Sequence, residues 1–375
     1  MLPGFKISKQ MKKFDTIMEK EIGGGFMEYF DGVLLYIFDR FKGERSLSAV
    51  YHLLTGKKSS QTIQDGKLFN VGSFFGILKK LKRSKLEQHV FTLLETQLIQ
   101  PNQHEGYQIT SGGKEALSTF LVTKPIPNYL AGWQYHQVSE LFWQRLSLFM
   151  QSLSYSIHGN MNFYPISKDE AIQNWVKKHF PVKKEKRVLL AEELFQEIRS
   201  HLQKLADQDA SFFVMRLSGE GRTGLTVHQL ADLHKISYEE AMIRFQGVIH
   251  GLLFQIQHKS VQYPILASMI EGASGQLPLT LSTKQTYNLL EDGMTIEEIA
   301  HTRRLKRSTI EDHLVEIAIN VPEFSINPFV DPKAQLEIRL ASKEINSQRL
   351  KLIKDYVNDQ YSYFEIRLTL CKEGI

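Results

Sequence analysis

Apolar residues recur at helical spacing over most of the chain, and residues 282–320 combine that spacing with two helix-start signals. Thr295 with Glu298, and Ser308 with Glu311, each have the spacing of a capping box, which predicts the first turns of two helices. The positions that a two-helix unit buries are Thr295, Ile299, Ala300, Leu305, Ile310 and Leu314. Residues 282–320 are therefore predicted to form a helix-turn-helix.

The same spacing occurs a second time in residues 225–253. Leu230 stands where Ile299 stands in the first unit, and the second helix again begins after a serine with glutamate three residues later. This helix starts with Glu239 and Glu240, whose negative charges would repel phosphate. The second unit is therefore predicted to be structural.

A third unit, in residues 27–123, has the order of elements of a winged helix. Residues 98–110 contain a polar turn between two short runs that predict a β-hairpin, and a helix is expected on either side of it. Helices are expected at residues 28–41, 46–54 and 71–81. A fourth helix is expected to begin at a capping box of Ser84 with Glu87, and a fifth is expected to begin near residue 111.

The fold class predicted from these patterns is mainly α, in three domains after an N-terminal extension. They are a winged-helix-like domain with a small β-hairpin (27–123), a helical middle domain with a degenerate helix-turn-helix (124–275), and a helix-turn-helix module with closing C-terminal helices (276–375). In the middle domain, helices are expected at 133–155, 171–180 (capped by Ser167) and 188–205, with a basic loop at 177–187. Linkers are expected at 277–281 and 321–332.

Residues 1–26 form the extension. Ile22-Gly23-Gly24-Gly25 would be encoded by a guanine-rich run just upstream of the codon for Met27, which resembles a ribosome-binding site. We expect Met27 to be the biological start, and no function is assigned to residues 1–26.

Composition narrows the class of protein. Apolar residues make up 42% and charged residues 23%, as in an ordinary globular protein. The longest apolar run, Val33–Phe38, is far too short to cross a membrane. The single cysteine, Cys371, excludes a disulfide framework and a cysteine-based zinc site and favours the cytoplasm.

No motif for catalysis or cofactor binding has its required context. Gly219–Gly224 has dinucleotide-loop spacing, but Leu225 stands where a phosphate loop needs lysine, and the following residues predict helix instead of a βαβ unit. Histidines do not occur at metal-ligand spacing. We therefore expect a protein that is not an enzyme, with no cofactor, no metal and no small-molecule substrate.

Two basic clusters are the candidate DNA-binding sites. The formal net charge is +5, yet residues 276–375 carry 13 Lys or Arg against 15 Asp or Glu, so their positive charge is local. The first cluster lies in the C-terminal turn and the helix after it, with His313 expected on the surface: Arg303, Arg304, Lys306, Arg307, Ser308, Thr309 and His313. The second precedes a helix of the winged-helix-like unit, where a solvated helix start is the alternative: Lys79, Lys80, Lys82, Arg83 and Lys85.

The C-terminal unit resembles the helix-turn-helix at the extreme C-terminus of many RecQ-type DNA helicases. The matching residues are Ile299-Ala300, Arg303 to Leu305, Ser308-Thr309-Ile310, His313-Leu314 and the closing tail Gln348–Leu370. Arg304 departs from the pattern, because a small residue is common at that turn position. Over its whole length the chain resembles the stand-alone bacterial proteins known as YpbB. These proteins carry the module without a motor and are typically encoded beside a RecQ-like helicase.

The resemblance implies a non-catalytic accessory protein of a RecQ-type DNA helicase, associated with the nucleoid, that acts in DNA repair or recombination. Its partners would be DNA, the helicase, or both. The same units also fit a DNA-binding transcriptional regulator. The acidic balance of residues 276–375 fits a third alternative, a protein-docking adaptor without DNA affinity.

Overall fold

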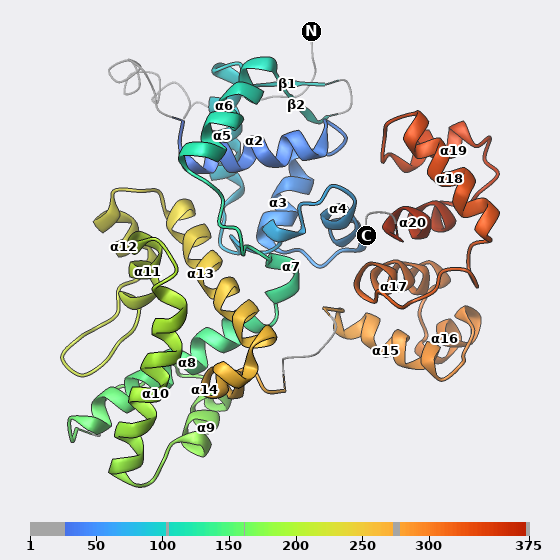
Figure 1. Cartoon of the computed structure of the whole chain (residues 1–375). Helices are drawn as coiled ribbons and strands as arrows, with labels where there is room; N and C mark the ends of the chain where they lie inside the picture. The colour runs from blue at the N-terminus through green and yellow to red at the C-terminus, as the bar shows by residue number, and fades with distance from the viewer. Residues whose placement is uncertain (1–26, 103–104, 161, 273–277, 373–375) are drawn as a thin grey trace.

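The computed structural model describes residues 27–102, 105–160, 162–272 and 278–372, and most of them lie in helices (Figure 1). Within these ranges the strands form one two-stranded antiparallel hairpin. The prediction of a mainly helical chain with a small hairpin is confirmed. The proposed extension, residues 1–26, and residues 273–277 at the edge of the proposed linker lie outside the described ranges.

The N-terminal region (residues 27–123) is built around helix α2, Tyr29–Phe41. Phe30, Leu34 and Phe38 are fully buried, and α2 packs against α5, α6 and β2. The surrounding helices are α3 (Leu47–Thr55), α4 (Ser60–Leu68), α5 (Arg83–Glu95) and α6 (Ser111–Thr123). Because its apolar residues occur on all sides, α2 forms the centre of this region.

The segment between α3 and α5 differs from the sequence prediction. Helix α4 was not predicted, because its sequence SQTIQDGKL is mostly polar and lacks an apolar stripe. The expected helix at 71–81 is wrong: this segment contains one 3₁₀ turn, η2 (Gly72–Phe74), followed by further turns. Its apolar side chains are nevertheless buried in the core of the N-terminal region.

The predicted hairpin between α5 and α6 is present. Strand β1 (Ile99–Pro101) pairs with β2 (Tyr107–Ile109), with Ile99 opposite Ile109. The Oγ1 atom of Thr110 accepts a hydrogen bond from the N–H of Gly113 and so begins α6 directly after the hairpin. The order helix, hairpin, helix that predicted a winged-helix-like unit is therefore found.

The middle region (residues 124–275) is helical throughout its described core. Its helices are α7 (Gly132–Tyr135), α8 (Val138–Ile157), α9 (Glu170–His179), α10 (Lys184–Leu202), α11 (Asp207–Val214), α12 (Val227–His234), α13 (Tyr238–His258), η3 (Ser260–Gln262) and α14 (Pro264–Ser268). The helix expected at 133–155 is divided into α7 and α8, and the basic loop expected at 177–187 is largely helical. Phe142 and Phe149 are buried in the apolar core of this region.

The C-terminal region (residues 276–375) contains α15 (Leu281–Glu291), α16 (Ile296–Arg303), α17 (Arg307–Asn320), α18 (Pro332–Glu344), α19 (Leu350–Tyr356) and α20 (Tyr363–Lys372). Helix α17 contributes side chains to two apolar clusters, one with α15 and α16 and one with α18 to α20. The segment expected as a linker at 321–332 is packed, since Val321, Ile326 and Val330 are buried.

Five helix starts test the predicted capping signals, and at α13 the Oγ atom of Ser237 accepts a hydrogen bond from the N–H of Glu240 as expected. The box of Thr295 with Glu298 is confirmed, with both reciprocal hydrogen bonds present. The boxes predicted at Ser84, Ser167 and Ser308 are wrong, because their helices begin after Lys82, Asp169 and Lys306. At α9 the carboxylate of Asp169 accepts the first helical N–H groups and takes the place of the serine.

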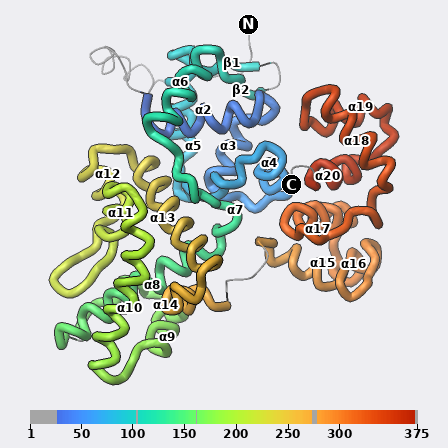
Figure 2. Tube along the Cα trace, viewed as in Figure 1, coloured from blue at the N-terminus to red at the C-terminus, as the bar shows by residue number. Residues whose placement is uncertain are grey.

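The three regions contact one another differently. Ile243 of α13 is buried inside the apolar cluster of the N-terminal region, so the middle and N-terminal regions share core. The C-terminal region lies beside the N-terminal region, with α17 and α20 against α4, as the backbone trace shows (Figure 2). Helix α17 is thus adjacent to a part of the chain about 250 positions away in sequence.

A close approach of two glycines holds the segment after η2 in place. Gly56 and Gly76 have φ values of +78° and +67°, and a Cβ on Gly56 would lie 2.8 Å from the Cα of Gly76. The N–H of Gly76 also donates to the carbonyl of Leu53 at 2.8 Å. A side chain at position 56 would therefore force α3 away from the loop that carries Lys79 and Lys80.

We expect Gly56→Ala to lower the free energy of unfolding by about 1–3 kcal/mol more than Gly159→Ala does. Gly159 has the same φ of +78° but nothing within 4 Å of its would-be Cβ, so it isolates the backbone strain. Urea denaturation of both variants measures the difference. Equal destabilisation would contradict the close-contact explanation.

Candidate nucleic-acid interface

The C-terminal helix-turn-helix consists of α16 and α17, with α15 packed across them. Ile299, Ile310 and Leu314 are fully buried between the helices. Thr295, expected to be buried, is exposed, because its side chain caps α16 from the surface. The core of the unit is otherwise that predicted from the spacing.

The turn between α16 and α17 is sharp although it lacks a small residue. Arg304 has a φ of +52°, and its N–H donates to carbonyls of the last turn of α16. The N–H of Leu305 donates to the carbonyl of Ala300 at 3.0 Å. Lys235 has a φ of +54° at the matching point between α12 and α13, so the two units share this left-handed turn.

Arg303 faces the interior of the C-terminal unit. Its guanidinium donates to the carbonyl of Ser282 at 2.7 Å and to Oε1 of Gln285 at 2.9 Å, and thus joins α16 to α15. Desolvation lowers the pKa of Arg303 from its usual value. This arginine, one of the DNA-contact candidates, is already committed to a structural contact.

The other DNA-contact candidates of the turn differ in exposure and in ion pairing. Arg304 and Lys306 are exposed and have no ion-pair partner among the described residues. Arg307 is exposed but paired with Glu297 and, at 3.0 Å, with Glu311. Two candidates at the start of α17 differ in exposure, with Ser308 exposed and Thr309 half-buried.

His313 is buried, which corrects the expectation of a surface histidine. Its Nδ1 lies 2.8 Å from Oγ1 of Thr286 and 3.4 Å from Nη1 of Arg303, behind α15. Burial, and secondarily the charge of Arg303, lowers the pKa of His313 to about 4. The imidazole is therefore neutral at pH 7, and its burial keeps it away from the surface that DNA could contact.

Beyond its first turn, the outward side of α17 contacts other helices. Asp312 accepts a hydrogen bond from Oγ of Ser60 at 3.1 Å and lies 2.6 Å from Nη1 of Arg367 on α20. Arg367 in turn donates to Ser60 at 2.5 Å and to Oε1 of Gln64 at 2.9 Å. Side chains from α4 and α20 thus contact one side of α17, which is the second helix of the helix-turn-helix.

The N-terminal basic cluster surrounds the start of α5. Lys80 and Lys82 are exposed and Lys85 is half-buried, whereas Lys79 pairs with Glu140 at 2.9 Å. Arg83 pairs with Glu87 at 2.9 Å within the first turns of the helix.

The fold adds two lysines that sequence analysis missed. Lys57 and Lys58 lie between α3 and α4, exposed, and Nζ of Lys57 is 3.5 Å from Nε2 of His52. Burial lowers the pKa of His52, and the charges of Lys57 and Arg83 lower it further. The two segments therefore form one surface, which we call the basic surface: Lys57, Lys58, Lys79, Lys80, Lys82 and Arg83.

The local sequence carried a partial signal for the added pair, two adjacent lysines directly after a glycine. The proximity of Lys57 and Lys58 to the segment from Lys79 to Arg83 arises only in the tertiary structure. The charges of Lys58 and Lys79 both act on His136 of the middle region, whose pKa burial lowers to about 4. The spacing of these residues along the chain could not predict that Lys58 and Lys79 both lie near His136.

The second helix of the second helix-turn-helix unit, α13, is largely buried. Glu239 and Glu240 are buried, and Arg244 is held by Glu240 at 2.9 Å and by Asp209 at 3.1 Å. Its guanidinium also lies 5.4 Å from the ring centroid of Tyr29 on α2. Helix α13 thus connects the middle and N-terminal regions and has a structural role.

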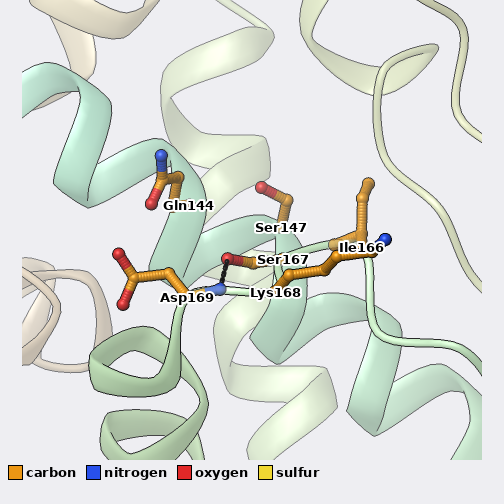
Figure 3. Close-up of a pocket in the computed structure, with 6 residues that line it drawn as sticks. All are labelled: Gln144, Ser147, Ile166, Ser167, Lys168 and Asp169. Atoms are coloured by element: carbon orange, nitrogen blue, oxygen red, sulfur yellow. Dashed lines mark hydrogen bonds between the residues drawn. The ribbon is translucent and has the colours of Figure 1, made fainter.

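The described residues hold no group of three or more His, Cys, Asp or Glu side chains positioned for a metal ion. No helix in the described part of the chain is long and apolar enough to cross a membrane. A hollow of about 340 Å³ lies between α8 and the segment before α9 (Figure 3). Two of its polar side chains are occupied locally: Ser147 donates to the carbonyl of Trp143, and Asp169 caps α9.

The glycine-rich segment Gly219–Gly224 forms a turn ahead of α12. The N–H of Gly224 donates to Oγ of Ser218 at 2.9 Å, and the N–H of Glu220 donates to Oγ of Ser154 at the same distance. These amide groups are turned toward the protein, whereas a phosphate-binding loop directs them at its ligand.

Residues 282–370 match the model of a family described as a helix-turn-helix domain. The whole chain is 34% identical over 348 residues to Protein YpbB of Bacillus subtilis (strain 168), and the match covers 92% of this chain and 98% of that protein. The chain belongs to the YpbB family. No solved structure matches this member of the YpbB family significantly.

The buried histidine makes the YpbB-type helix-turn-helix sensitive to acid. Between pH 6.5 and about 4 the unfolded chain binds a proton at His313 that the folded chain does not, so stability falls as pH falls through this window. We expect His313→Gln to reduce the loss of unfolding free energy between pH 7 and pH 5 by up to about 2 kcal/mol. Denaturation at both pH values measures it, with His301→Gln on the exposed side of α16 as control. An unchanged pH dependence in His313→Gln would contradict this role.

Proposed function

We propose that this chain is a non-catalytic accessory protein of a RecQ-type DNA helicase that contacts DNA in repair or recombination. The observation that carries the proposal is a C-terminal helix-turn-helix whose turn exposes Arg304 and Lys306, in a chain that belongs to the YpbB family. The sequence contains no nucleotide-binding motif in its required context, so ATP hydrolysis would come from the partner helicase.

DNA would be held mainly through its phosphates. Arg304 and Lys306 provide free cationic groups at the turn, and the basic surface adds further charge on the N-terminal region. The covered side of α17 leaves few side chains for base contacts, and phosphate contacts carry no sequence information. This favours sequence-independent binding of the kind an accessory factor needs over the operator recognition of a transcriptional regulator.

We expect Arg304→Asn with Lys306→Gln to weaken binding to duplex DNA and to reduce the slope of log affinity against log salt by about 2 units. Asparagine tolerates the left-handed conformation of position 304, so the turn is kept. Fluorescence anisotropy over a range of salt concentrations measures both quantities.

The matched control is Lys235→Asn, which changes the same backbone position of the internal unit. It should leave affinity and salt slope unchanged. If the Arg304 and Lys306 variant binds DNA as tightly as the unaltered chain, with the same slope, the turn does not contact DNA and the protein-docking adaptor becomes the better interpretation.

The helicase partnership has its own test. The unaltered chain and a RecQ-type helicase of the same organism should co-purify, and the complex should persist after nuclease treatment. Loss of the complex on nuclease treatment would make DNA the shared ligand. Absence of any complex would contradict the accessory role while leaving DNA binding intact.

A further inference from the structure

We propose that α17 is a docking helix that fastens the C-terminal region to the N-terminal region, and that it does not enter the DNA major groove. This inference goes beyond the proposed function, which requires DNA contact but does not specify the contacting surface. It assigns the outward stripe of α17 to an intramolecular joint. It leaves the turn and the basic surface as the DNA-contacting parts.

The first step is the stripe itself. Ser308, Asp312, Glu316 and Asn320 follow one another at intervals of four, and therefore lie along one side of α17. Ser308 is exposed, but each later member is occupied or buried. Nε1 of Trp133 on α7 donates to Oδ1 of Asn320 at 2.5 Å. The stripe is thus in contact with the rest of the chain along its length, except at its first residue.

The second step is the charge of the stripe. Two of its four members are acidic, which is unfavourable beside phosphates but complementary to the groups that face them. Asp312 meets Arg367, and Lys58 lies near enough to Glu316 to lower its pKa against the larger raising effect of burial. Glu316 also accepts hydrogen bonds from Oγ1 of Thr283 at 2.6 Å and from Thr280, so it anchors the start of α15.

The third step is space. The major groove is about 12 Å wide, and one helix with its side chains is about 10–12 Å across. Helix α17 packs against α4 and α20 as well as α15 and α16. A helix flanked in this way cannot enter the groove beyond its first turn. Of the first-turn side chains, Arg307 is already paired with two glutamates.

The joint is specific, with several polar contacts far apart in sequence. The N–H of Gln348 donates to Oε2 of Glu44 at 2.9 Å, and Arg349 donates to the carbonyl of Gly43 at 3.1 Å. Nε2 of Gln137 donates to the carbonyl of Leu279 at 3.0 Å. Together with the Asp312 contacts, these bonds fix the C-terminal region at three separate places.

A covalent lock tests this assignment. In a chain carrying Ser60→Cys and Asp312→Cys, mild oxidation with copper phenanthroline should join the two thiols as a disulfide, because Oγ of Ser60 and Oδ1 of Asp312 are 3.1 Å apart. The native Cys371 is fully buried, and burial raises its pKa to about 12, so it remains an unreactive thiol. Crosslinking should be nearly complete in the native chain, in which Cys371 is buried. Ser60→Cys alone is the control for modification.

DNA binding is then compared before and after locking. We expect the locked chain to bind duplex DNA within about twofold of the unlocked chain, since phosphate contacts at the turn are unaffected. A loss of about tenfold or more on locking would overturn the inference and show that α17 must leave α4 to bind. Failure of the crosslink to form would also overturn it.

The outcome separates the two proposals. Efficient crosslinking in a chain that binds no DNA, locked or unlocked, contradicts the proposed DNA contact and supports α17 as a docking helix. DNA binding by the unlocked chain alone supports the proposed function and contradicts the docking assignment.

Discussion

One helix, α17, must satisfy the packing of two clusters and a polar joint at once. Its inner positions, such as Ile310 and Leu314, complete the helix-turn-helix, and Val315 belongs to the cluster of the closing helices. Its remaining side carries Asp312 against Ser60 and Arg367. Because almost no position of α17 is unassigned, its placement determines where the C-terminal region and its basic turn lie.

The arrangement separates the source of stability from the candidate binding groups. Apolar burial and buried polar contacts are concentrated in helices, whereas Arg304, Lys306, Lys57 and Lys58 lie in turns or at helix starts. Exposed cations at such places cost little to the fold and remain available to phosphates. Arg303 is different: it lies next to Arg304 in sequence but is bonded to α15.

Local sequence predicted those features that depend on local spacing. The helix-turn-helix units, the hairpin and the capping box of Thr295 follow from periodicity and caps within about twenty residues. Two of the errors come from contacts between separate helices: His313 of α17 is buried against Thr286 of α15, and α4 is a polar helix next to α17 and α20. The error at Ser308 is local, because the N-cap of α17 is Lys306, two residues earlier.

The left-handed turn occurs twice, at Lys235 and at Arg304, with φ values that differ by only a few degrees. After one turn come two buried acids, and after the other come exposed Lys306 and Ser308. Backbone geometry and surface chemistry are therefore set by different residues in this motif. A repeated unit of this kind can therefore keep its backbone architecture while its role changes. Substitution of the few side chains that follow the turn is enough to convert a buried packing helix into an exposed basic surface.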